Sequence, residues 1–136
     1  MKRPIVKSTD FLKIKSTMAH KEDTPVIADL KVTLEAHADE CVGLAANMIG
    51  YPKQMIIVQT EKGALVMINP EIKKRVGKYE ASESCLSLFG ERKAVRYKEI
   101  EVKFLDEQFK PRRERFSGFT AQVIQHECDH LKGIII

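Results

Sequence analysis

Two histidines near the end of the chain have the spacing of a metal site. They belong to the stretch QHECDH, in which His126 and His130 are four residues apart and Glu127 follows the first histidine. On a helix, residues four apart project side by side, so both imidazoles can hold one ion. Glu127 would project about 60–100° from them around the helix axis, beside that ion. An HExxH pair whose glutamate acts as a general base is typical of a hydrolytic metal site.

The other side of this predicted helix is apolar. Its stripe has the spacing 3, 4, 3 and consists of Ala121, Ile124, Cys128 and Leu131. A helix buried on both sides makes two unpaired histidines costly, which favours a metal between them. The alternative is a pair of hydrogen-bonded core histidines with a surface glutamate. Cys128 belongs to the apolar stripe, so we expect it to pack rather than to bind the metal.

A third protein ligand is needed, because a catalytic zinc-type site usually has three. The stretch ESCLS (83–87) offers the thiol of Cys85 in a polar, turn-like segment. Cys41, beside a loop of small residues, is the competing candidate. Acidic residues are also abundant, so the residue types alone leave the third ligand open.

The first half of the chain predicts a helix followed by a hairpin. Apolar residues have helical spacing over 25–40, after a Thr-Pro start signal. Small residues and a Gly-Tyr-Pro end predict a loop over 41–52 that leads into or borders a strand. The runs 54–60 and 64–70 are strand-like and are separated by the turn signal of residues 61–63.

The second half predicts two more strands and the histidine helix. Residues 94–105 alternate apolar and charged side chains, as a strand with one wet face does, and 109–116 would pair with them. The last helix would run from Gly118 or Phe119 to Lys132 and end at Gly133. This order of elements predicts the α+β class.

Length and composition predict one soluble domain, residues 1–136, since 136 residues with 43% hydrophobic and 31% charged side chains are usual for a globular domain. The apolar runs are too short for a membrane span. Three cysteines without an export signal predict reduced thiols and a cytoplasmic location. The net charge of +4 would suit RNA, but 23 basic and 19 acidic residues spread along the chain favour an ordinary mixed-charge surface.

Three stretches in order resemble the peptide deformylase family. They are CVGLAANM (41–48), ESCLS (83–87) and QHECDH (125–130), where the family has GxGLAAxQ, EGCLS and QHExDH. The similarity extends through INPE (68–71) and to Arg92, seven residues after the motif cysteine. It covers nearly the whole chain from about residue 25 on. The resemblance implies antiparallel β-sheets packed around a central C-terminal metal-binding helix, with a helix near the N-terminus.

The resemblance also implies a catalytic set. Cys85, His126 and His130 would bind one divalent metal, Fe2+ in the cell, with Zn2+ or Ni2+ also accepted. Glu127 would be the general base for a metal-bound water. The backbone N–H of Leu86 would hold the developing oxyanion.

Further residues around this set are implied by the same resemblance. Glu83 and Arg92 would fix the segments that carry the metal ligands. Substrate contacts are implied at Val42, Gly43 and Val123.

The function that the resemblance implies is hydrolysis. The chain would remove the N-formyl group from the N-terminal formyl-methionine of newly made polypeptides. Its partners would be N-formylmethionyl nascent peptides, with weak ribosome association and no DNA or membrane, and we expect a monomer.

Departures from the family motifs lead to an alternative. Met48 stands where the family has a glutamine that donates to the oxyanion, and a thioether has no proton to donate. Asn47 has the right chemistry one position away, and should face the other way. Cys41 and Ser84 replace glycines, and Gln122 puts a polar group where the family has apolar pocket residues. The alternative is a catalytically weak or inactive deformylase-like metal-binding protein that binds peptides or another partner.

Overall fold

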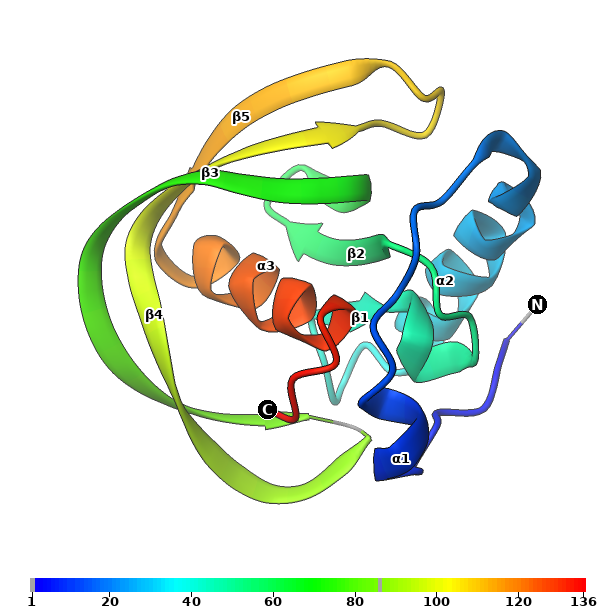
Figure 1. Ribbon diagram of the computed structural model, residues 1–136, viewed down its shortest axis with the longest axis horizontal. Helices are drawn as coiled ribbons and strands as arrows, with labels where there is room; N and C mark the ends of the chain where they lie inside the picture. The colour runs from blue at the N-terminus through cyan, green and yellow to red at the C-terminus, as the bar shows by residue number, and fades with distance from the viewer. Residues whose placement is uncertain (1, 86) are drawn as a thin grey trace.

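The last helix of the chain lies at the centre of the molecule, with strands wrapped around it (Figure 1). The computed structural model describes residues 2–85 and 87–136. Its helical elements are α1 (Thr9–Leu12), η1 (Lys21–Asp23), α2 (Pro25–Ala36), η2 (Ala46–Ile49) and α3 (Gly118–Leu131). Its strands are β1 (Gly43–Ala45), β2 (Met55–Thr60), β3 (Gly63–Cys85), β4 (Leu88–Leu105) and β5 (Pro111–Ser117).

The strands form one antiparallel sheet in the order β1-β2-β3-β4-β5. β2 and β3 are joined by a tight turn, with Thr60 opposite Gly63. The pairing of β3 with β4 shifts register near Ile68 and again near Ile72. Bulges of this kind increase the twist and bend of a strand pair. β3 and β4 accordingly curve around α3, while α2 lies on the side opposite their bend (Figure 1).

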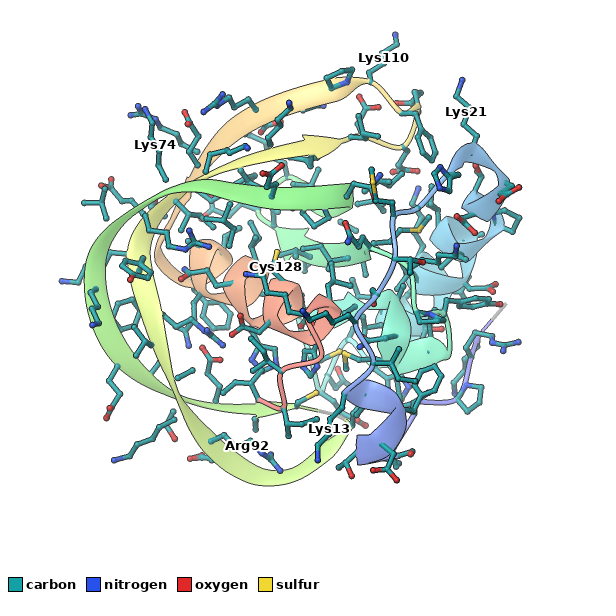
Figure 2. All side chains as sticks on the ribbon, in the orientation of Figure 1. Lys13, Lys21, Lys74, Arg92, Lys110 and Cys128 are labelled. Carbon is teal, nitrogen blue, oxygen red and sulfur yellow. The ribbon has the colours of Figure 1, made fainter. Side chains whose placement is uncertain are left out.

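The central helix is held by its apolar stripe and by its last turn. All four stripe residues are buried, namely Ala121, Ile124, Cys128 and Leu131. Gly133 ends the helix with φ 77°, and a Cβ on it would lie 2.3 Å from the Lys13 carbonyl oxygen. Only glycine fits this close approach. The predicted helix, its glycine stop and the packing role of Cys128, labelled in Figure 2, are therefore confirmed.

The α+β class and the antiparallel arrangement around the C-terminal helix are also confirmed. Two local predictions were incomplete. The ESCLS segment does contain a turn between strands, since Ser87 lies in a turn, but Cys85 itself is the last residue of β3 and pairs with Leu88 of β4. The predicted loop 41–52 contains β1 and η2, because small residues can pair in a short buried strand without showing an alternating pattern. Among the described residues, no helix has the length and apolar content needed to cross a bilayer.

Candidate metal centre and active site

A thiol and two imidazoles meet where the end of β3 approaches α3. One donor atom each from Cys85, His126 and His130 lies within 4.8 Å of the others. The Nε2 atoms of the two histidines are 3.1 Å apart. Two nitrogens bound at 2.0–2.1 Å to a tetrahedral ion would be about 3.3 Å apart. The three side chains therefore fit a divalent metal, and the thiol and imidazoles suit Zn2+ or Fe2+.

The ring orientation of His126 is fixed by Glu83. His126 Nδ1 lies 2.7 Å from Glu83 Oε1, which leaves Nε2 to face His130. Burial opposes the charge of Glu83, but hydrogen bonds with His126 and Arg96 outweigh it and lower its pKa to about 2. An ionised carboxylate behind a metal-binding imidazole is the usual outer partner of such a ligand.

The arginine that contacts Glu83 is Arg96. Its Nε and Nη2 lie 2.9 and 2.7 Å from the two carboxylate oxygens, and its Nη1 reaches Asp129 at 2.7 Å. The family resemblance predicts Arg92 in this place, and the described contacts of Glu83 with an arginine are made by Arg96. Arg92 is the cross-strand neighbour of Glu83, and its side chain lies at the rim of the molecule near the end of the β3–β4 pair (Figure 2). Arg96 lies further along β4 and reaches both carboxylates.

Glu127 faces a cleft of about 360 Å³ beside the metal donors. The cleft walls include Val42, Gly43 and Val123, which the sequence analysis assigned to substrate contacts. A Cβ on Gly43 would lie 2.7 Å from Val123 Cγ1 and 3.1 Å from Glu127 Oε2. The motif glycine is therefore needed for the close approach of β1 to the helix. Burial raises the pKa of Glu127 to about 7, a range suited to a proton acceptor at neutral pH.

Met48 lies in the cleft wall, fully buried, at the position of the family's glutamine. Its Sδ accepts a weak hydrogen bond from the Ala45 N–H at 3.4 Å. A thioether has no hydrogen to donate, so Met48 offers no donor to the cleft. Asn47 points away, as predicted, and its Nδ2 donates to the His130 carbonyl oxygen at 2.9 Å. The amide of Asn47 therefore holds the last turn of α3 and does not replace the missing glutamine.

The other substitutions also border the cleft. Cys41, Ser84 and Gln122 line it, and Cys41 is half-buried. Cys41 is not part of the metal cluster found among the described residues, so the competition for third ligand favours Cys85. Leu86, predicted to supply an oxyanion N–H, lies outside the described residues.

Gln125 and Asp129 make hydrogen bonds around the site that the sequence did not predict. Gln125 bonds both the N–H and the carbonyl of Tyr97, and Asp129 binds Arg96, so both fasten α3 to β4. A signal for Arg96 was present, because the alternation of β4 puts it on the same side as the buried Ile100 and Val102.

A helix with two metal-spaced histidines and a buried glutamate, facing a thiol on a strand end, defines a class of metal-dependent hydrolase. A sequence model described as polypeptide deformylase matches residues 3–136. The chain is 52% identical to a peptide deformylase of Clostridium beijerinckii over 136 residues, 100% of each chain. It is 41% identical to one from Aquifex aeolicus over 121 residues, 84% of this chain and 70% of the relative.

Solved structures agree with these matches. A peptide deformylase from Thermotoga maritima superposes with a TM-score of 0.90 at 28% identity, covering 99% of this chain and 95% of that one. A Met-Ala-Ser-bound class I type b peptide deformylase from Acinetobacter baumannii superposes with a TM-score of 0.88 at 28% identity, covering 99% and 97%. The chain belongs to the peptide deformylase family, whose members are hydrolases that remove a formyl group.

Proposed function

We propose that this chain removes the N-formyl group from the N-terminal formyl-methionine of newly made polypeptides. The observation that carries the proposal is the meeting of Cys85, His126 and His130 beside Glu127 at one cleft. This set combines three metal donors with a buried carboxylate. A cleft with both is suited to hydrolysis of a small amide.

The cleft can receive an extended peptide end. β1 is the edge strand of the sheet, and the neighbouring Val42 and Gly43 border the cleft. An edge strand can pair with an added peptide through its backbone groups. Val123 and Phe119 supply apolar surface for the methionine side chain. A relative from Acinetobacter baumannii was solved with Met-Ala-Ser bound, which supports a peptide as the ligand.

Cys85, His126 and His130 would hold one divalent ion, and we propose Fe2+ in the cell, with Zn2+ or Ni2+ able to replace it. When bound, the ion supplies positive charge that acidifies water and polarises the formyl carbonyl. Glu127 takes a proton from the attacking water and delivers it to the amine as the amide C–N bond breaks. The products are formate and a free N-terminal amine.

The oxyanion is held with fewer donors than the family motif provides. Met48 offers a thioether in place of an amide, so we propose the Leu86 backbone N–H as the remaining protein donor. We further propose that the chain acts as a monomer in the cytoplasm on nascent peptides. Its net charge of +4 is compatible with weak ribosome association.

The test is formate release from a formyl-Met tripeptide by anaerobically purified protein loaded with iron or nickel. Glu127→Ala keeps the three metal donors and removes the base, so it is the matched control. We expect wild-type protein to release formate about 10²–10⁴ times faster than this variant. Equal rates would refute the proposal. They would support the alternative, which is peptide binding without turnover. The substitutions at Met48, Cys41 and Ser84 are the reason for considering this alternative.

A further inference from the structure

Gln122 is a polar residue in the cleft wall that the proposed chemistry leaves unused. It lies on α3 one turn before His126, near the apolar side chains of Phe119 and Val123. Its side-chain amide is bonded at both ends. The Tyr79 hydroxyl donates to Gln122 Oε1 at 3.2 Å, and Gln122 Nε2 donates to Glu83 Oε2 at 2.9 Å.

These bonds continue to the metal donors. Glu83 uses Oε2 to accept from Gln122 and Oε1 to contact His126 Nδ1 at 2.7 Å. Arg96 holds the same carboxylate from β4. Glu83 is therefore fixed between a cation on one strand and an amide on the helix. These hydrogen bonds set the orientation in which Glu83 Oε1 contacts the imidazole of His126.

The hydrogen bonds form a series from Tyr79 through Gln122 and Glu83 to His126. In the bonds between Tyr79, Gln122 and Glu83, the donor and the acceptor are defined. An ionised Glu83 can only accept hydrogen bonds, so the amide of Gln122 must present Nε2 to it. The amide oxygen then faces Tyr79, whose hydroxyl is a donor there. Tyr79 and Gln122 are both half-buried, so the series joins the cleft wall to the buried Glu83. An apolar residue at position 122 would remove two of these bonds together.

We propose that Gln122 is a positioning residue, which orients the metal ligand His126 through Glu83 and is itself anchored by Tyr79. This inference rests on the metal set of the proposed function. Outer partners of metal ligands commonly change metal affinity 10–100-fold. Gln122 acts one link further out, so its loss should weaken metal binding about 3–10-fold, and the loss of Tyr79's hydroxyl less.

The variants are Gln122→Met, Tyr79→Phe and the two combined. Methionine keeps the length of glutamine without its hydrogen bonds. Tyr51→Phe is the matched control, because it removes a tyrosine hydroxyl bonded to Asp29, a side chain outside the cleft lining. The Co2+ dissociation constant is measured by competition with a chelator, and the visible spectrum of the Co2+ form reports ligand geometry.

We expect Gln122→Met to raise the Co2+ dissociation constant about 3–10-fold and to shift the spectrum. In deformylation it should lower kcat while leaving KM equal or lower, because the cleft wall becomes more apolar. Tyr79→Phe should have a smaller effect that disappears in the Gln122→Met background, as expected for groups in one series. Tyr51→Phe should match the wild type.

Three results would overturn the inference. One is a Gln122→Met protein whose Co2+ affinity lies within twofold of the wild type with the same spectrum. A second is full additivity of the two substitutions, which would separate Tyr79 from Gln122. A third is an equal loss of affinity in Tyr51→Phe, which would indicate general destabilisation. Failure of wild-type protein to bind Co2+ would instead refute the metal set of the proposed function, and the inference with it.

Discussion

Neighbouring residues of the last motif face different parts of the molecule, because each step along a helix turns by about 100°. His126 and His130 face Cys85, while Glu127 faces the cleft. Cys128 lies between Glu127 and His130 in the sequence, but its side chain packs in the core. The site therefore needs only one helix to carry two ligands and the base, and one strand end to bring the thiol.

Met48 is the residue at which the rate should be most easily improved. Met48→Gln places an amide N–H donor in the cleft wall in place of the buried Sδ. Removing one oxyanion donor usually costs about 10²–10³ in rate, so supplying one should raise kcat by about 10–10²-fold. Steady-state kinetics on a formyl-Met tripeptide would measure this.

Met18→Gln is the control for that substitution, because Met18 is 57% exposed and does not line the cleft. It should leave kcat unchanged. An unchanged kcat in Met48→Gln as well would mean that the missing amide does not limit catalysis.

We expect the thiol of Cys41 to be alkylated slowly, although Cys41 lines the cleft. Burial, followed by the charge of Glu127, raises the pKa of Cys41 to about 11. The thiolate is the nucleophile, so alkylation at pH 8 should be slow and should accelerate about tenfold per pH unit as the pH rises toward 11. Iodoacetamide labelling of metal-loaded protein, located by peptide mass spectrometry, measures this. Labelling of Cys41 at pH 7.5 at the rate of an unfolded control would contradict it.

At the scale of elements, Arg96 joins β3, β4 and α3. It is 4% exposed and binds Glu83 of β3 and Asp129 of α3. Arg96→Met would leave the buried Glu83 without its cation. Breaking such a buried pair typically costs about 3–5 kcal/mol of the free energy of unfolding. Urea denaturation measures the change.

Arg112→Met is the comparison for Arg96→Met. Arg112 is 46% exposed and pairs with Glu114 on the surface of β5, so its loss should cost less than about 1 kcal/mol. Equal losses of stability in the two variants would show that the buried contacts of Arg96 have no special role.

α2, α3 and the β2–β3 hairpin were predictable because their signals are local. The apolar stripe and Gly133 fixed α3, and the turn at residues 61–63 fixed the β2–β3 pair. β1 was not predictable, since its residues Gly43–Ala45 have no alternation. Arg96 was missed because its two partners lie on other elements, and only the curvature of β3 and β4 brings them together.

At the scale of the whole molecule, the metal donors come from segments far apart in the chain. Cys85 lies on the strand pair that curves around α3, and His126 and His130 lie on α3 itself (Figure 1). The metal set could be predicted only through the family motifs, because residue types alone left Cys41 and acidic residues open. The contacts of Gln122 with Tyr79 and Glu83 depend on three-dimensional packing and have no local pattern.

Metal loading should stabilise the fold, because the donors join α3 to the end of β3. Free Zn2+ at 100 times its dissociation constant should add about 2.7 kcal/mol to the free energy of unfolding. Cys85→Ser should weaken this gain, and a chelator should remove it. Thermal unfolding with and without metal measures the effect, and an identical Tm in both conditions would contradict metal binding to the folded chain.

The most direct test of the whole account is formate release measured together with metal content on the same sample. We predict that the rate per chain rises in proportion to bound Fe2+ or Ni2+, reaches its maximum at one ion per chain, and is abolished by chelation. Undiminished formate release after removal of the metal would contradict the account, and so would its absence from protein that holds one ion per chain.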